Sequence, residues 1–343
     1  MARRPTIQDV AKAAGVSQAT VDRVLNGREQ VREETARRVY DAARRIGYHA
    51  APLNAQRLQA DLPVLRMGVV LHKEREVFYQ NLAAELEAAA ARATGLRVKP
   101  VIEFATSQSP ADFVALMQGM RGRADVIAAS AVTHPDVTDV VATLKAEGIP
   151  TFALLNDFAP GVRQNYLGLN NLKVGRIAAS LIGMAARGPG KVAVFVGGHR
   201  WHGHELREAG FRSWFREYAP RFQILDTLAN LETRQLTYEA TLDLLARHPE
   251  LRGIYVAGGR MEGTIAAVRE VRKPSEVCLV VNELTPQSRG GLVDGFVTMV
   301  IATPLPQLCD DLVRLMAEAA KAGPSEVAGQ HFLRPELILP ESV

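Results

Sequence analysis

A short segment near the start of the chain, residues 6–26 (TIQDVAKAAGVSQATVDRVLN), constrains the fold most. Apolar residues recur at i, i+3, i+4 and i+7 from Ile7 to Ala14, which predicts one helix with a single apolar face. Gly15 then permits a sharp turn, because glycine adopts a positive φ without steric cost. Two short helices joined by a glycine turn are typical of a helix-turn-helix.

Capping residues stand at the start of both helices. Thr6 is expected to cap the first helix, with Asp9 three residues on, and Ser17 is expected to cap the second. A third helix is expected from about Arg32 to Ile46, with Gly47 as its C-cap. Three helices of this size close a small core, and without further motifs the same pattern would suit a purely structural bundle.

The charge of the chain is concentrated at this end. Residues 1–60 carry eleven Lys and Arg against six Asp and Glu, whereas residues 61–343 carry 30 against 31. A basic segment ahead of a nearly neutral body favours attraction to nucleic acid, although solvated arginines on a helix give the same count. The charge alone does not decide between these two interpretations.

Composition excludes several classes of protein. No run of 18 apolar residues occurs and the start lacks a secretory signal, so we expect a cytoplasmic protein without membrane contact. Cys278 and Cys309 both lie in apolar segments, which predicts buried thiols rather than a disulfide framework or a zinc site.

From Val64 onward, β-branched apolar runs alternate with helical segments. This alternation predicts an α/β fold of two similar lobes, each a parallel sheet covered by helices, after an all-α helix-turn-helix headpiece. The expected organisation is a headpiece over 1–49, a hinge or linker over 50–62 and a two-lobed domain over 63–343. Its first lobe is expected at about 63–161 and 295–324, and its second at about 162–294 and 325–343.

Thr6 to Leu58 resembles the DNA-binding headpiece of the lactose-repressor family, including its TVxRVLN core, here Thr20 to Asn26, and the hinge leucine, here Leu58. Residues 66–340 resemble periplasmic-binding-protein-like effector domains. Two departures from the family pattern stand out. Asp22 stands where many members carry Ser, and Tyr48 to Leu58 is one residue longer than in the lactose repressor.

The second helix would enter the major groove with its first turn. Gln18 suits a bidentate contact to adenine, Ala19 suits a thymine methyl, and Arg23 suits guanine or a phosphate. Asp22 either orients Arg23 or excludes wrong sequences. Phosphate contacts or capping are the expected roles of Thr6, Ser17, Thr20 and Asn26.

Residues 49–60 predict neither a long helix nor a strand. The resemblance implies a hinge that orders on operator DNA, with Leu58 between base steps of the minor groove and Arg57 near phosphate. Asn54 belongs to the same expected contact segment. A plain interdomain linker is the alternative.

Ligands of doubly wound sheets bind outside the carboxyl ends of the strands. Arg207 matches the family's ligand-binding arginine, and Trp201 is expected to line the cleft and stack on ligand. Other candidates follow predicted strands: Phe78 and Tyr79 as stacking aromatics, Asp157 and Asn170 as partners of ligand hydroxyls, and Glu283 as an acidic contact. Two structural alternatives stay open, namely an aromatic that anchors its helix in the core and a Glu283 that serves as a helix-cap charge.

Familiar ligand contacts of the family are missing. Gly258, Gly259 and Arg260 stand where members often carry Asn-Asp, and the Gln-Asp pair common before the proline is absent at Pro304. The sugar bound by a known family member therefore cannot be assigned to this chain as its ligand. The histidines of the segment 199–204 lack a carboxylate or cysteine set that would complete a metal site, so neither metal nor cofactor is expected.

No dinucleotide fingerprint, phosphate loop or nucleophile elbow occurs, so we do not expect an enzyme. We expect a repressor of transcription that binds double-stranded operator DNA as a homodimer, with a tetramer as the larger alternative. Its effector is expected to be carbohydrate-like: a sugar, a polyol or a sugar acid. The alternatives are a sugar-modifying enzyme fused to a headpiece and a sugar-binding protein that does not bind DNA.

Overall fold

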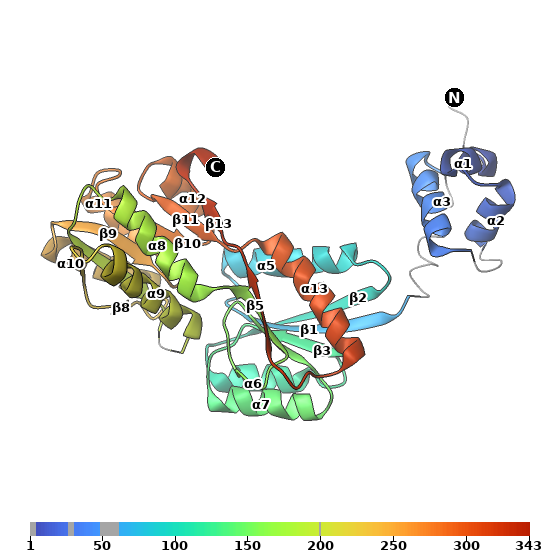
Figure 1. The fold of residues 1–343 in the computed structure, drawn as a ribbon, viewed down its shortest axis with the longest axis horizontal. Coiled ribbons are helices and arrows are strands. Elements are labelled where there is room, and N and C mark those ends of the chain that lie inside the picture. Colours follow the sequence, from blue (N-terminus) through green and yellow to red (C-terminus); the bar gives the residue numbers. More distant parts are fainter. Residues whose placement is uncertain (1–4, 27–30, 49–61, 199) are drawn as a thin grey trace. The chain divides into compact units, whose positions relative to one another are not determined.

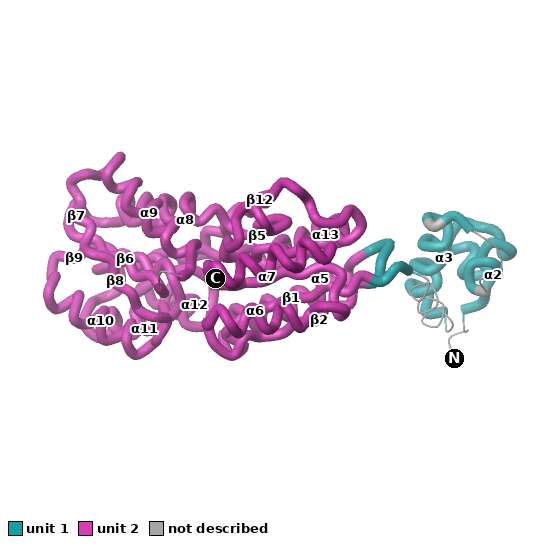
Figure 2. The backbone as a smooth tube through the Cα atoms, turned by 90° about the horizontal axis from the view of Figure 1, so that it is seen from below, with its two compact units in different colours: residues 1–64, 94–97 teal, residues 65–93, 98–343 magenta. Residues whose placement is uncertain are grey.

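The computed structural model describes residues 5–26, 31–48, 62–198 and 200–343. The chain divides into two compact units, residues 1–64 with 94–97 and residues 65–93 with 98–343 (Figure 2). None of the helices within the described ranges is long and apolar enough to cross a membrane.

The described part of the first unit contains three helices: α1 (Ile7–Ala14), α2 (Gln18–Asn26) and α3 (Glu33–Arg45). The predicted N-caps are confirmed, because both N and Oγ1 of Thr6 donate to Asp9 Oδ2 at 2.8 Å and Thr20 N donates to Ser17 Oγ at 3.1 Å. The C-cap of α3 is Ile46, one residue before the expected Gly47. Gly15 makes the turn with a φ of 65°. The helix-turn-helix is thus present.

Side chains of α3 bind backbone carbonyl groups at the C-terminal ends of α1 and α2. Arg38 Nη2 donates to Ala14 O at 3.0 Å, and Tyr40 OH donates to Val24 O at 2.7 Å. The last carbonyls of a helix have no partner inside the helix, so these bonds satisfy them. Because the apolar faces also meet in one core, α2 is held rigidly against α3.

A six-stranded sheet forms the first lobe of the second unit, in the order β12-β5-β4-β3-β1-β2. Helices α5 and α13 cover one face, and α6 and α7 cover the other (Figure 1). The elements are β1 (Val64–His72), α5 (Val77–Arg92), β2 (Arg97–Ala105), α6 (Pro110–Gly119), β3 (Val126–Ala129), α7 (Pro135–Ala146), β4 (Thr151–Leu154), β5 (Asn165–Leu169), α13 (Leu305–Ala322) and β12 (Gly329–Leu333).

The second lobe has the order β13-β11-β10-β9-β6-β7, with β8 also paired to β6. Strand β13 runs antiparallel to β11, and the other recorded pairs are parallel. The elements are α8 (Asn171–Ala185), β6 (Lys191–Val196), α9 (His202–Tyr218), β7 (Gln223–Ile224), β8 (Leu228–Ala229), α10 (Arg234–Arg247), β9 (Leu251–Val256), α11 (Met261–Val271), β10 (Cys278–Asn282), α12 (Pro286–Val293), β11 (Met299–Ala302), β13 (Glu336–Ile338) and a final 3-10 turn (Pro340–Ser342).

The chain crosses between the lobes after β5, after β11 and after β12. The expected lobe boundaries need correction at these points. Strands β5 and β12 pair with each other in the first lobe, although both were expected in the second, and β11 pairs with β10 in the second lobe, although it was expected in the first. Strands buried on both faces are apolar throughout, so their pattern does not say which sheet they join.

Candidate functional site

The first candidate surface is the outer face of α2. Gln18, Ala19 and Arg23 are exposed there, which is the arrangement that groove contact requires. The Oγ atoms of Ser17 and Thr20 lie 2.8 Å apart, so these two side chains close the start of the helix. The contacts expected of Asn54, Arg57 and Leu58, and of the Asn26 side chain, lie outside the described residues.

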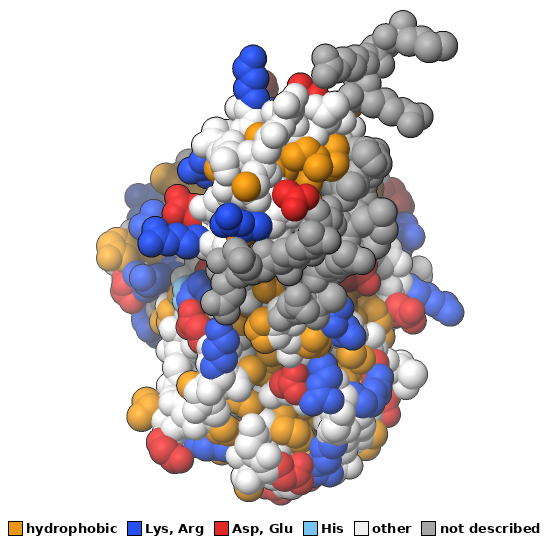
Figure 3. Space-filling model, turned by 90° about the vertical axis from the view of Figure 1, so that its right-hand side faces the viewer, with side chains coloured by type: hydrophobic (Ala, Val, Ile, Leu, Met, Phe, Trp, Pro, Cys, Tyr) orange, Lys and Arg blue, Asp and Glu red, His pale blue; other side chains and the backbone are white. Residues whose placement is uncertain are grey.

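The face of the molecule drawn in Figure 3 carries charges of both signs. On the face that Figure 3 draws, Lys and Arg side chains are interspersed with Asp and Glu side chains. Phosphate contacts position a protein on DNA without choosing its sequence, so sequence choice by the first unit would depend on the exposed side chains of α2.

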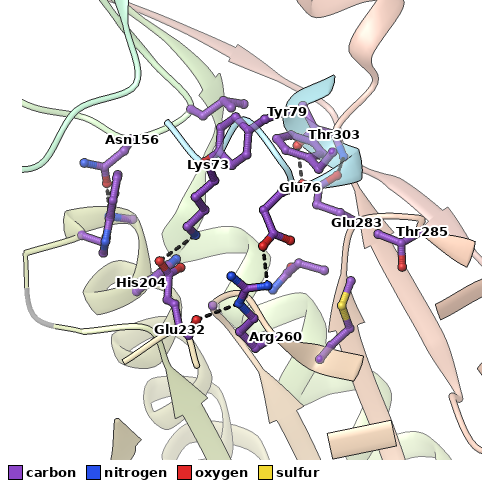
Figure 4. A pocket seen from close by; sticks show the side chains of 18 of the residues that line it. Lys73, Glu76, Tyr79, Asn156, His204, Glu232, Arg260, Glu283, Thr285 and Thr303 are labelled. Carbon is purple, nitrogen blue, oxygen red and sulfur yellow. Dashed lines mark hydrogen bonds and ion pairs between the residues drawn. The ribbon is translucent and has the colours of Figure 1, made fainter. Parts of the chain in front are cut away.

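The second candidate site is a cavity of about 580 Å³ between the two lobes of the second unit. Its walls follow the carboxyl ends of strands in both sheets, where ligands of such folds bind. Figure 4 shows side chains from both lobes pointing into it, among them Lys73 and Glu76 from the first lobe and Glu232, Arg260 and Glu283 from the second.

The structure brings five of the seven predicted ligand contacts to this cavity: Phe78, Tyr79, Trp201, Arg207 and Glu283. Asp157 and Asn170 are not among the lining residues. The Asp157 carboxylate pairs with Arg163 at 2.5 and 2.8 Å, and Asn170 Oδ1 accepts from Lys173 N at 3.1 Å. Asp157 thus holds the loop between β4 and β5, and Asn170 caps the start of α8.

Two of the predicted stacking aromatics, Trp201 and Tyr79, are largely buried by other protein side chains. Trp201 is 5% exposed and stacks on His72, with ring centroids 4.5 Å apart. The Tyr79 hydroxyl is hydrogen-bonded to His72 Nε2. Phe78, the third predicted stacking aromatic, also lines the cavity. Its ring packs edge-on against Tyr79.

Arg207 is held in place by two bonds from one side. Its Nε donates to Asn171 Oδ1 at 2.7 Å, and its Nη1 donates to Ala257 O at 2.8 Å. Nη2 meets no acceptor among the described residues. A guanidinium anchored in this way keeps one donating edge for a ligand.

A buried ion pair that the sequence analysis missed crosses the cavity. Lys73 Nζ lies 2.6 Å from Glu232 Oε2, and their side chains are 17% and 4% exposed. Arg260 adds a second bridge between the lobes, pairing with Glu76 and donating from Nε to Glu232 O at 2.7 Å. Lys73 directly follows β1, so the strand-end rule could have found it. Glu232 follows β8, a two-residue strand that the sequence pattern did not predict.

The ion pair shapes the titration of its surroundings. Burial raises the pKa of Glu232, but the Lys73 ammonium and His204 outweigh burial and bring this pKa down to about 2. Burial lowers the pKa of His204 to about 3, and it lowers the pKa of His72 well below the ordinary range. The carboxylate is therefore ionised at neutral pH while both imidazoles are neutral.

Glu283 behaves in the opposite way. Burial raises the pKa of its carboxyl group, against two hydrogen bonds from Thr303, one from N at 3.0 Å and one from Oγ1 at 2.7 Å. The cap of α12 is Thr285, so the carboxyl group of Glu283 faces Thr303 instead of closing that helix.

Backbone strain gathers at the cavity. Of the eight non-glycine residues with positive φ in the described ranges, five line it: Lys73, Leu155, Glu232, Arg260 and Glu283. Each such residue costs on the order of 1–3 kcal/mol and persists only where its surroundings hold it. Such clustering is typical of a functional site.

Acidification is expected to destabilise the chain through the two buried histidines. Their pKa values are lowered in the folded state, so the unfolded chain binds protons first as the pH falls below about 6.5, and the stabilisation declines toward the pKa of about 3 of His204. Each histidine contributes a slope of about 1.4 kcal/mol per pH unit in this window. Urea unfolding at pH 7, 6, 5 and 4 measures it. His204→Gln should flatten the slope, whereas the half-exposed control His202→Gln should not; an unchanged slope in His204→Gln would contradict the assignment.

No group of three or more His, Cys, Asp or Glu side chains within the described residues is arranged to hold a metal ion.

Residues 67–324 match the periplasmic binding protein domain, and residues 6–51 match the bacterial regulatory proteins of the lacI family. The chain is a lacI-family regulatory protein. The predicted family and fold class are thereby confirmed.

Curated relatives of this lacI-family protein are transcriptional regulators. It is 27% identical to the HTH-type transcriptional regulator GntR of Pseudomonas aeruginosa over 81% of this chain and 79% of the relative. It is 23% identical to GalS of Salmonella typhimurium over 98% of this chain and 96% of the relative. These relatives agree with the prediction that the chain is not an enzyme.

Solved structures share the two-lobed fold. A periplasmic solute-binding protein of Actinobacillus succinogenes with bound D-allose superposes with a TM-score of 0.73 at 17% identity, covering 82% of this chain and 98% of that protein. A solute-binding protein of Bacillus halodurans with bound myo-inositol gives 0.70 at 17% identity, covering 81% of this chain and 95% of that protein. At these identities the likeness concerns the fold alone.

Proposed function

We propose that this lacI-family regulator is a homodimeric cytoplasmic repressor whose operator affinity is set by a small polar ligand in the cavity between the lobes. The observation that supports it best is the combination, in one chain, of a helix-turn-helix with exposed Gln18, Ala19 and Arg23 and a cavity of about 580 Å³ at the strand ends. One headpiece contacts only a few base pairs, so two related by symmetry would cover both halves of a palindrome.

Among sugars, polyols and sugar acids, the unspent hydrogen-bonding groups favour the acids. Arg207 keeps Nη2, and among the described residues Lys73 Nζ has one hydrogen-bonding or ionic partner, Glu232. His204 Nδ1 accepts from Gly197 N at 3.3 Å, so the neutral ring carries its hydrogen on Nε2. The two deepest carboxyl groups, Glu232 and Glu283, already have protein partners. Three free donors beside two partnered carboxyl groups suit a ligand carboxylate next to several hydroxyls.

In the proposed mechanism the ligand bonds to both lobes and changes the angle between them. That change would alter the spacing of the two hinges in a dimer, with Asn54, Arg57 and Leu58 as the proposed hinge contacts. Such coupling is a free-energy difference between two states, typically about 1–3 kcal/mol, and it acts equally on ligand and operator affinity.

A thermal-shift panel on the full chain tests the effector class. D-Gluconate and D-glucuronate are compared with D-glucose, D-allose and myo-inositol. A sugar acid is expected to raise Tm, since a ligand at a hundred times its Kd stabilises the folded form by about 2.7 kcal/mol. Arg207→Ala should remove the shift, and Arg216→Ala, an exposed arginine on the same helix, should keep it.

Shifts caused only by the neutral compounds would overturn the preference for acids while leaving a carbohydrate effector in place. A normal shift in Arg207→Ala would remove this residue from the site.

A further inference from the structure

One residue of the second lobe is buried in the first. Trp201 lies between β6 and α9, yet its indole packs in the hydrophobic cluster of the first lobe together with Phe113 and Phe158. The ring stacks on His72 at the end of β1 with an interplanar angle of 21°. An indole that is 5% exposed against the opposite lobe loses this environment if the lobes separate.

A single amide group joins this indole to the buried ion pair. Gln108, between β2 and α6 of the first lobe, accepts at Oε1 from Trp201 Nε1 at 2.9 Å. Its Nε2 donates to Glu232 Oε2 at 2.8 Å. An indole only donates and a carboxylate only accepts, so both partners together fix the orientation of the amide. Neither a hydrocarbon nor a second carboxylate at position 108 satisfies both.

The carboxylate at the other end is placed by its surroundings. Asn230 Oδ1 accepts from Glu232 N at 2.9 Å, and Asn230 Nδ2 donates to Gly259 O at 2.9 Å. A Cβ atom at Gly197 would lie 2.6 Å from Glu232 Cγ, so only glycine leaves room for this side chain. The Gly258-Gly259 pair, which replaces the usual ligand contacts of the family, borders the same space.

Two backbone contacts continue the same seam. Thr133 N donates to Arg200 O at 3.0 Å, and Gly203 N donates to Asn156 Oδ1 at 2.9 Å. In both cases the donor and the acceptor come from opposite lobes, on either side of Trp201. The segment around the tryptophan is therefore docked on the first lobe by both its backbone and its ring.

We propose that Trp201, Gln108 and Glu232 form an interlobe clasp that holds the effector domain closed before any ligand binds. Gln108 is the positioning residue, since its amide makes the burial of the tryptophan depend on the carboxylate that faces the cavity. The clasp deepens the proposed function, because the fraction of closed molecules scales the apparent ligand affinity. In this proposal Trp201 acts as a lobe anchor, in addition to the ligand stacking expected from the sequence.

The full chain without ligand or DNA tests the clasp. The sequence contains two tryptophans, so Trp214→Phe leaves Trp201 as the only one. In this background Trp201 is expected to resist acrylamide quenching. Gln108→Leu is expected to raise the quenching constant several-fold and to shift the emission to longer wavelength, with an unchanged far-ultraviolet dichroism spectrum. Gln118→Leu, an exposed glutamine on α6, is the matched control and should change neither.

Glu232→Gln and Lys73→Met provide a second route if Gln108→Leu does not fold. Each should also raise quenching of Trp201, because each removes one partner from the buried pair. Unchanged quenching in the folded variants would overturn the clasp. Because no effector or operator enters this experiment, a failure of the clasp is distinguishable from a failure of the proposed repressor function.

Discussion

Specific operator binding is expected to weaken by about 10³–10⁵-fold between 50 and 200 mM salt, for roughly six to ten phosphates neutralised per dimer. The reason is counterion release, since the basic first 60 residues carry eleven Lys and Arg against six acidic residues in each protomer. Fluorescence anisotropy measures it, with a labelled duplex that the protein itself selects from a random pool. A scrambled duplex of equal length reports the non-specific component. A flat salt response would contradict a DNA-binding role for this segment.

Arg23→Ala separates base choice from phosphate contact in the same assay. If Arg23 contacts guanine, the selected duplex should lose about 1–3 kcal/mol while the scrambled duplex changes little. A phosphate contact would instead weaken both duplexes equally and lower the salt slope by about one. The effector-induced thermal shift should persist in the variant; its loss together with DNA binding would indicate a folding defect.

The headpiece was predictable because its signals are local. The pairing of Thr6 with Asp9, the positive φ of Gly15 and the cap at Ser17 each depend on residues within three positions of one another. The bonds from Arg38 and Tyr40 to the ends of α1 and α2 were not predictable, because they join residues 16 to 24 positions apart. Local chemistry gives the elements, and the side chains that fix their angles come from elsewhere.

The cavity was predictable only in part for a related reason. The strand-end rule placed Phe78, Tyr79 and Glu283 correctly at the cavity, since each follows a strand of the expected series. It also selected Asp157, which pairs with Arg163 in the same loop between β4 and β5. Whether a charged side chain faces a ligand or a protein partner depends on how its loop folds, and the strand pattern does not show that.

Replacing Gly175 by alanine is expected to cost about 3 kcal/mol and to disable the effector site at the same time. A Cβ atom at this position on α8 would lie 1.9 Å from the carbonyl oxygen of Arg207 on α9, and a Cβ at Gly210 would lie 2.0 Å from Leu172 O. The two helices therefore touch through their backbones. A real Cβ requires more than 3.0 Å, so α9 must move by over an ångström.

That displacement carries Arg207 with it, because the clashing atom belongs to this residue. A shift of this size breaks the 2.7 Å bond to Asn171 and moves Nη2 away from the cavity, so the loss of binding should exceed what the loss of stability explains. Thermal unfolding with and without D-gluconate measures both, with a fall in Tm of roughly 6–12 °C. Gly119→Ala is the matched control, since a Cβ at that helical glycine meets nothing within 4 Å and alanine favours the helix. If Gly175→Ala matched this control in stability and ligand shift, the backbone contact between α8 and α9 would not be what positions Arg207.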